Sequence, residues 1–217
     1  MLIAGVDDAG RGPVIGPLVI AGILIDDNQS SVLQALGVKD SKVLTPNKRI
    51  HLFPQILGLA QKYAIVELSP SEVDKIVFEG KKLHRLNWLE AKAMAEVIGK
   101  LIPEVAYVDA SDVVEERFGQ QISELLPSQI KIVSEHQADA NYPVVSAASI
   151  IAKVHRDKFV SNLRDVYGDF GSGYPCDPKT KQFLSNWIRD ERPLPDFVRK
   201  SWKTFRLLDE RNRQKRL

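Results

Sequence analysis

Four aspartates stand at places in the sequence where carboxylates could work together. Asp7 and Asp8 follow the short apolar run that opens the chain and precede a Gly-Arg-Gly turn. Asp109 ends a second apolar run, and Asp139 comes just before a segment rich in small residues. An acid at the end of a buried strand is costly unless it is paired or binds a metal. The four residues therefore indicate a metal site, although a helix cap or a turn remains the alternative for Asp139 taken alone.

The donor set indicates which metal and which reaction to expect. Clustered carboxylates repel one another and raise each other's pKa, and divalent cations are the simplest means of keeping them ionised. Oxygen ligands without a set of Cys and His favour Mg²⁺ or Mn²⁺ over Zn²⁺. Two such ions about 3.5–4 Å apart can activate a water and stabilise the leaving oxygen in phosphodiester cleavage. We therefore predict that Asp7, Asp8, Asp109 and Asp139 are both the catalytic residues and the ligands of two ions.

Short apolar or β-branched runs, alternating with segments of helical period, must position these acids. The predicted strands are residues 2–6, 17–25, 61–68, 104–109 and 129–133. The predicted helices are residues 46–60, 70–76, 85–101, 113–126, 144–167, 178–189 and about 202–213. This order predicts an α/β fold with a mixed central sheet flanked by helices. Because no strand is evident after residue 177, we expect a catalytic domain over residues 1–176 and a helical, substrate-binding appendage over 177–217.

Several helix starts have a physical signature. Thr45-Pro46 and Asp177-Pro178 each place a capping oxygen before a proline at the first helical position, and Ser69 with Glu72 forms a capping box. Farther along, Trp202, Phe205 and Leu208 recur at helical spacing, which predicts a core-facing stripe more readily than a base-stacking surface.

Composition limits the classes of protein. With 217 residues and 44% hydrophobic residues the chain can bury a core, and its apolar runs are shorter than a membrane helix needs. We therefore expect a cytoplasmic protein, and a monomer because no apolar repeat indicates self-association. The single cysteine, Cys176, excludes an internal disulfide. Net charge is only +2, but residues 199–217 are rich in Lys and Arg, which indicates either a polyanionic partner or a solvated helix face.

Six segments together resemble the type 2 ribonuclease H family (ribonuclease HII), particularly its archaeal members. They are residues 5–21 (GVDDAGRGPVIGPLVIA), 39–44 (KDSKVL), 107–111 (YVDAS), 138–157 (ADANYPVVSAASIIAKVHRD), 171–180 (GSGYPCDPKT) and 201–204 (SWKT). They span nearly the whole chain in the family's order. The resemblance implies a ribonuclease H fold and the four-carboxylate site.

The resemblance also implies how substrate is bound. Gly10, Arg11 and Gly12 would contact the ribose 2′-hydroxyl through their backbone, with Tyr174 near the sugar at the RNA–DNA junction. Glycines allow close approach of the main chain, and the 2′-hydroxyl distinguishes RNA from DNA. Ser41 and Lys42 would help to grip the phosphate backbone. The alternatives are a plain tight turn at residues 10–12 and a solvated loop at 41–42.

The implied activity is an endoribonuclease of DNA replication and repair. It would hydrolyse the RNA strand of RNA–DNA hybrids and cut on the 5′ side of ribonucleotides embedded in duplex DNA. One residue departs from the family pattern, which has glutamate where this chain has Asp8. The alternative hypothesis is therefore a hybrid-binding module with weakened catalysis. Another nuclease or transposase of the same superfold would share the acids but has no reason to carry the motifs around Gly12 and Tyr174.

Overall fold

The computed structural model describes residues 1–38, 41, 43–79, 85–190 and 193–214. Its strands are β1 (Leu2–Ala9), β2 (Leu18–Asp26), β3 (Lys62–Leu68), β4 (Val105–Asp109) and β5 (Lys131–Glu135). Its helices are η1 (Asp27–Gln29), α1 (Ser30–Ala35), α2 (Pro46–Leu59), α3 (Pro70–Glu79), α4 (Arg85–Leu101), α5 (Glu115–Leu125), α6 (Ala138–Asn141), α7 (Pro143–Tyr167), α8 (Pro178–Arg189) and α9 (Lys203–Gln214). None of the described helices is both long enough and apolar enough to span a membrane.

The chain divides into two compact units. The sheet unit comprises residues 1–9, 19–67 and 86–155, and the helical unit comprises residues 10–18, 68–85 and 156–217. The helical unit thus holds the predicted appendage, residues 177–217, together with three other stretches of the chain. The assignment of substrate binding to residues 177–217 stays a prediction.

The sheet has five strands in the order β3-β2-β1-β4-β5. β1 lies in the middle, antiparallel to β2 and parallel to β4, and β4 is parallel to β5. The sheet is therefore mixed, as predicted. β1 extends three residues beyond the predicted strand because Asp7, Asp8 and Ala9 continue the ladder, opposite Ala21, Ile20 and Val19.

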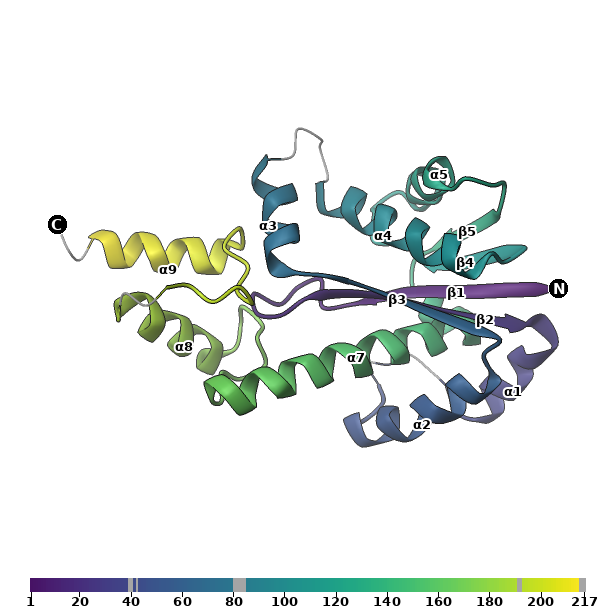
Figure 1. The fold of residues 1–217 in the computed structure, drawn as a ribbon, viewed down its shortest axis with the longest axis horizontal. Helices are drawn as coiled ribbons and strands as arrows, with labels where there is room; N and C mark the ends of the chain where they lie inside the picture. Colours follow the sequence, from purple (N-terminus) through teal and green to yellow (C-terminus); the bar gives the residue numbers. More distant parts are fainter. Residues whose placement is uncertain (39–40, 42, 80–84, 191–192, 215–217) are drawn as a thin grey trace. The chain divides into compact units, whose positions relative to one another are not determined.

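Helices cover both faces of the sheet unit, with α1, α2 and the start of α7 on one face and α4 and α5 on the other (Figure 1). Two glycines bring helices unusually close. A Cβ added at Gly5 would lie 2.2 Å from the Val144 carbonyl oxygen, and one at Gly22 would lie 2.5 Å from Val97. The backbone of α7 therefore rests directly on β1. The small residues 146–149 and 152, farther along the same helix, are all buried.

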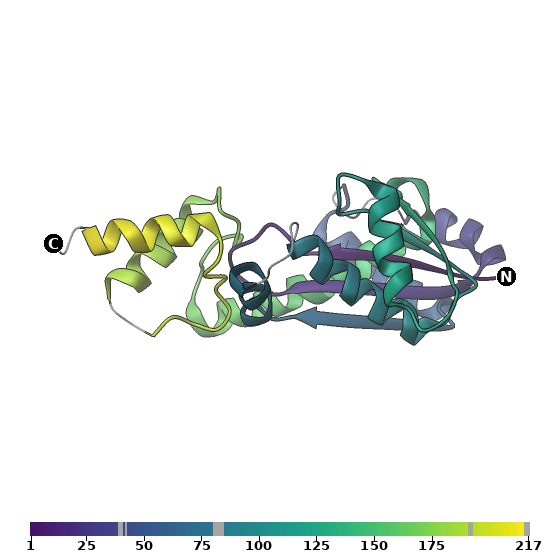
Figure 2. The same cartoon turned by 90° about the horizontal axis from the view of Figure 1, so that it is seen from above.

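The helical unit has its own core. Val14, Phe170, Leu184 and Phe197 are buried in it together with Phe205, and Trp202 and Leu208 pack against it. This confirms the predicted core-facing stripe. α8 and α9 pack side by side within this unit (Figure 2).

The predicted caps are present in atomic detail. The Thr45 hydroxyl accepts a hydrogen bond from the Lys48 amide at 3.3 Å, and Asp177 accepts one from Lys179 at 2.9 Å. Ser69 and Glu72 bond each other's amides, at 2.8 and 3.3 Å. Each cap satisfies amides that a helix start leaves without an intrahelical partner, which is why these starts could be located from sequence.

Candidate active site

Asp7 lies on the central strand and is buried, with only 4% of its surface exposed. Its carboxylate accepts a hydrogen bond from the Ser149 hydroxyl of α7 and another, at 2.7 Å, from the Asp8 amide. Burial raises the pKa of the Asp7 carboxyl well above its usual range, and the charges of Asp8 and Asp109 raise it further. The two hydrogen bonds act in the opposite direction. Asp7 is therefore a buried acid whose ionised form is disfavoured by desolvation and by the two neighbouring carboxylates.

Asp109 ends β4, the parallel neighbour of β1. The pairing runs from Ile3 opposite Val105 to Val6 opposite Val108, so Asp7 and Asp109 are the next positions in the register. The carboxyl ends of neighbouring parallel strands lie at the same edge of a sheet. This explains why the charge of Asp109 affects the pKa of Asp7, although the two acids are 102 residues apart in the sequence. Asp109 accepts a hydrogen bond from the Ala138 amide at 2.8 Å.

That hydrogen bond brings the fourth predicted acid near the strand ends, because Asp139 follows Ala138 in the short helix α6. Asp139 is 2% exposed, and its carbonyl oxygen accepts a hydrogen bond from the Ser146 hydroxyl at 2.5 Å. Gln137, which precedes the helix, has a left-handed backbone with φ 56°. A non-glycine residue is uncommon in that region, so the turn into α6 is a special conformation.

The charges of Asp8 and Asp109 thus act on the carboxyl group of Asp7. Asp139 follows Ala138, whose amide donates a hydrogen bond to Asp109. Asp8 is half-buried, and alternation along the strand turns it to the face opposite Asp7. Within the described part of the chain, no three His, Cys, Asp or Glu side chains already have the spacing of a formed metal centre. The all-oxygen donor set nevertheless fits a hard divalent ion, which would relieve the repulsion felt by Asp7.

Ser149 was missed as a functional candidate because its small, polar side chain sits in a run that reads as packing. Its hydroxyl contacts Asp7 and also lies 2.8 Å from the Ser41 hydroxyl. Ser41 is itself buried, and its carbonyl oxygen accepts a hydrogen bond from the Arg49 guanidinium at 2.8 Å. In this structure Ser41 therefore supports Asp7 through Ser149. Its predicted phosphate contact stays a prediction, and Lys42 lies outside the described residues.

The predicted ribose-binding residues come together within the helical unit. A Cβ added at Gly12 would lie 3.4 Å from Cε1 of Tyr174, so the ring lies against the Gly-Arg-Gly turn. Both Val14 and Ile15 donate backbone hydrogen bonds to the Gly173 carbonyl, at 2.8 and 3.3 Å. Tyr174 is 39% exposed, which leaves part of its ring open to a ligand. Arg11, the middle residue of the turn, is partly exposed as well.

Gly10 requires its glycine for two reasons. Its backbone is left-handed, with φ 93°, and an added Cβ would lie 2.4 Å from Nε of Arg156. The Arg156 side chain is buried there, donates to the Ile15 carbonyl at 3.2 Å, and lies 6.0 Å from the Tyr174 ring. The sequence offered no signal for this role, because Arg156 looks like one more cation on a charged helix.

Comparison with known proteins settles the family. The model of the family described as Ribonuclease HII matches residues 4–205. The chain belongs to the ribonuclease HII family. A ribonuclease HII of Thermococcus sibiricus is 47% identical over 213 residues, covering 97% of this chain and 92% of the relative.

Two solved structures of the family have the same fold. The ribonuclease H2 of Pyrococcus horikoshii is 43% identical, with a TM-score of 0.91 over 99% of this chain and 100% of that one. The ribonuclease HII of Archaeoglobus fulgidus, solved as a complex with PCNA, is 42% identical, with a TM-score of 0.85 over 95% and 96%. The predicted family, its archaeal character and the ribonuclease H-like fold are confirmed. Ribonuclease HII enzymes are metal-dependent hydrolases that cleave the RNA of RNA–DNA hybrids, so the predicted enzyme class is confirmed too.

Asp8 occupies the position at which the family resemblance led us to expect glutamate. If Asp8 is a metal ligand as predicted, we expect Asp8→Glu to raise kcat, because the longer side chain would bring the carboxylate closer to the ion by one methylene. Cleavage rates of parent and variant should be compared across a series of Mg²⁺ and Mn²⁺ concentrations. Equal or lower activity of the glutamate variant throughout would mean that this site has adapted to aspartate.

Proposed function

We propose that the chain cuts on the 5′ side of ribonucleotides embedded in duplex DNA, in addition to hydrolysing the RNA strand of hybrids, with Asp7, Asp8, Asp109 and Asp139 holding two Mg²⁺ or Mn²⁺ ions. The observation that carries this is the charge coupling of Asp7 to Asp8 and Asp109 at adjacent strand ends. A buried acid destabilised by two neighbouring carboxylates is what a cation site requires.

Each part of the chain then has a task. The bound ions would supply activation of the attacking water and stabilisation of the leaving 3′-oxygen, which gives 3′-hydroxyl and 5′-phosphate ends. Ser149 orients the Asp7 carboxylate, and the Ala138 amide orients that of Asp109. We assign reading of the 2′-hydroxyl to the backbone of residues 10–12, with the exposed face of Tyr174 against the sugar.

The direct test is cleavage of a labelled DNA duplex that holds one ribonucleotide, with Mg²⁺ or Mn²⁺ added. We expect one cut on the 5′ side of the ribonucleotide, leaving a 3′-hydroxyl end that a DNA polymerase can extend. The all-DNA duplex of the same sequence is the control and should stay intact. The comparisons give no support to a binding module without catalysis. Retention of the ribonucleotide duplex without any cut would contradict the proposal.

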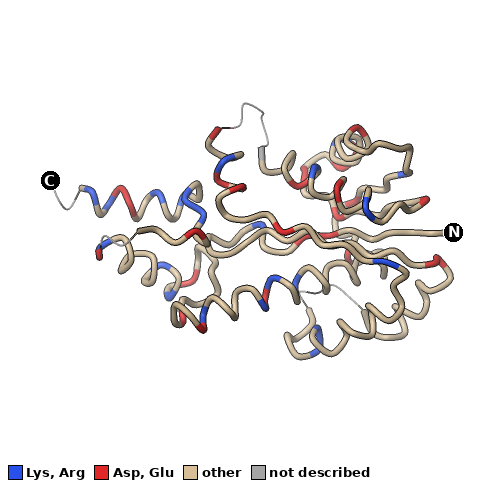
Figure 3. Tube along the Cα trace, viewed as in Figure 1, with Lys and Arg blue, Asp and Glu red and all other residues tan. Residues whose placement is uncertain are grey.

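Exposed basic residues lie along α9, interrupted by acidic ones (Figure 3). We propose that they contact phosphates. If so, affinity for the ribonucleotide duplex falls steeply with salt, and each lost contact reduces the slope of log K against log [salt] by about 0.9.

We therefore expect the double variant Arg206→Gln/Arg211→Gln to have a shallower salt slope than the parent, by up to about 2. Charge substitution is preferable to truncation because Leu208 of the same helix packs into the core. Lys62→Gln/Lys131→Gln, at the starts of β3 and β5, is the matched control. Equal slopes for the α9 variant and the parent would show that α9 is not part of the binding surface.

The Archaeoglobus relative was solved with PCNA, and we propose a PCNA as a partner of the chain. Size-exclusion chromatography with light scattering, with and without PCNA, tests both that association and the predicted monomer. A single unshifted peak in the mixture would argue against the partner.

A further inference from the structure

Arg199 is a buried cation in the helical unit, and its side chain has no measurable exposure. Its guanidinium donates hydrogen bonds to the carbonyl oxygens of Gly10 at 2.6 Å, Arg11 at 2.8 Å and Gly16 at 3.1 Å. A buried guanidinium is costly unless its donors are paired. These three bonds therefore tie the side chain and the loop of residues 10–16 to one another.

Trp202 completes the arrangement. Its ring lies over the Arg199 guanidinium, 4.7 Å from ring centre to carbon, and its indole Nε1 donates to the Gly12 carbonyl at 2.9 Å. The carbonyl oxygens of Gly10, Arg11 and Gly12 are thus all held by the segment 199–202. We call Arg199 and Trp202 the loop clamp.

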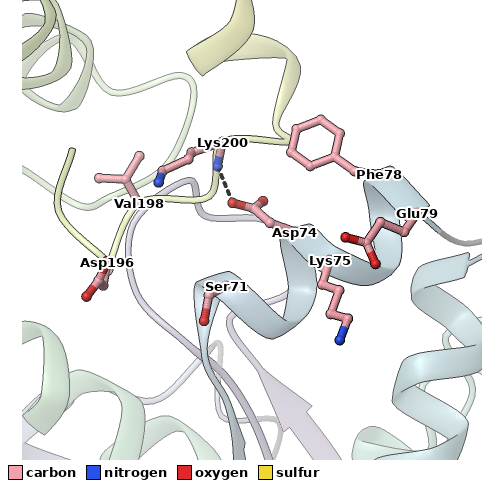
Figure 4. A pocket seen from close by; sticks show the side chains of 8 residues that line it. All are labelled: Ser71, Asp74, Lys75, Phe78, Glu79, Asp196, Val198 and Lys200. Carbon is pink, nitrogen blue, oxygen red and sulfur yellow. Dashed lines mark hydrogen bonds between the residues drawn. The ribbon is translucent and has the colours of Figure 1, made fainter. Parts of the chain in front are cut away.

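The segment that carries the clamp is itself anchored. Asp74 of α3 accepts hydrogen bonds from the Lys200 amide at 2.7 Å, the Ser201 amide at 2.9 Å and the Ser201 hydroxyl at 2.6 Å. Figure 4 shows the first of these bonds at the rim of a pocket lined by α3 and the segment 196–200. Because Asp74 fixes the two residues that lie between Arg199 and Trp202, the clamp has little freedom to move.

The hydrogen bonds from Arg199 to the Gly10 and Arg11 carbonyls also fix the direction of the amide groups that follow them in the chain. In a trans peptide the C=O of one residue and the N–H of the next point in opposite directions, and the structure has no cis peptide among its described bonds. Fixing the carbonyls of Gly10 and Arg11 toward Arg199 therefore turns the N–H groups of Arg11 and Gly12 away from it. The peptide after Gly12 has no N–H, because residue 13 is proline.

We propose that Arg199 is a positioning residue that aims the Arg11 and Gly12 amides at the ribose 2′-hydroxyl, and that Trp202 supports it by fixing the Gly12 carbonyl at the end of the turn and by covering the guanidinium. The proposal rests on the proposed function, since it explains what orients the turn that reads the sugar. Neither residue has to touch substrate: the clamp acts through the peptide planes of the loop.

The sharpest test is Trp202→Phe, which removes the N–H that binds the Gly12 carbonyl and keeps a ring over Arg199. Trp187→Phe is the matched control, because Trp187 donates its indole N–H to the Pro193 carbonyl at 3.0 Å in the same unit. For each protein kcat/KM is measured on the single-ribonucleotide duplex, and Ki is measured for the all-DNA duplex as competitor. A merely structural role would change both quantities together.

We expect Trp202→Phe to lower kcat/KM by about 10- to 100-fold, since misplacement of a reacting group by about 1 Å costs on the order of 100-fold. Its Ki for the all-DNA duplex should stay within twofold of the parent, and Trp187→Phe should match the parent in both. An unchanged kcat/KM for Trp202→Phe, or a Ki that rises in step with the loss, overturns the proposal.

Arg199→Lys gives a graded second test, because lysine keeps the charge but cannot reach three carbonyls in the fixed geometry of a guanidinium. We expect it to fold and to lose more kcat/KM than Trp202→Phe, again with Ki unchanged. An Arg199→Lys protein that is folded by circular dichroism and fully active would also reject the clamp. If the parent itself leaves the ribonucleotide duplex uncut, the proposed function fails before the variants are compared, so the two failures are distinguishable.

Discussion

Asp7→Asn is expected to abolish cleavage while leaving the fold intact, and Asp109→Asn is expected to do the same. Each substitution removes the charge of a proposed metal ligand at nearly constant volume. The loss should exceed the 10- to 100-fold typical of removing a partner outside the ligand set. Rates are measured on both the hybrid and the single-ribonucleotide duplex at saturating Mg²⁺. Asp165→Asn, an exposed acid late in α7, is the control and should cleave like the parent. Turnover near the parent rate in either site variant would remove that residue from the catalytic site.

The same variant carries a stability signature with a definite sign. Because the folded-state pKa of Asp7 is raised, its contribution to stability is fully present below the ordinary carboxyl pKa near 4 and is lost as pH rises through the raised value. Without metal, the Tm of Asp7→Asn minus that of the parent should therefore increase as pH rises above about 4. With Mg²⁺ the order should reverse, because only the parent is stabilised by binding the ion. A metal-induced rise in Tm that persists in Asp7→Asn would contradict its role as a ligand.

Gly12→Leu is the second change from which we expect a large effect. A Cβ at Gly12 already lies 3.4 Å from the Tyr174 ring, so a leucine side chain must displace either the ring or the sugar. Cleavage of a duplex with a single ribonucleotide should fall by about 100-fold or more. The rise in Tm on adding Mg²⁺ should survive, because all four acids remain.

Tyr174→Ala probes the same contact from the other side, with Tyr174→Phe as a control that keeps the ring. The alanine variant should lose more activity on the single-ribonucleotide duplex than on a long RNA–DNA hybrid. Only the former forces every cut to use one defined junction. If Tyr174→Ala cuts the embedded ribonucleotide as fast as the parent, Tyr174 is an ordinary packing residue of its loop.

Local signals in the sequence located most of the elements. The helices at residues 85–101 and 178–189 were predicted to the residue, the second because Asp177-Pro178 marks its start in a way that depends only on neighbouring atoms. The helices α1 and α6 were missed, since six and four residues are too few to show a helical period. β1 was predicted too short because Asp7 and Asp8 end the apolar pattern although the hydrogen-bonded ladder with β2 continues.

The candidate site also contains residues with a local signal in the sequence and residues without one. The four acids could be proposed from sequence because carboxylates at apolar strand ends are conspicuous, whereas the residues that hold Asp7 and the Gly-Arg-Gly turn in place could not. Ser149 and Arg199 act through side chains whose partners lie over 100 residues away in the chain, on Asp7 and Ser41 for the first and on Gly10 and Arg11 for the second. No local pattern encodes such a pairing, and it becomes visible only when the fold is known.

β1 is hydrogen-bonded to a strand on each side, so the part of the proposed metal site that it carries has little freedom to move. Amides of Ala4 and Val6 lie in the middle of the sheet, and we expect them to exchange with deuterium at the rate of global unfolding, with or without Mg²⁺. α6 has only four residues behind the left-handed Gln137, so its amides should exchange by local opening and slow markedly when the ion binds. Slower amide exchange in β1 on ion binding, with unchanged exchange in α6, would contradict this expectation. On this view Asp7 is the fixed ligand, and Asp139 is the one that shifts to suit the radius of the ion.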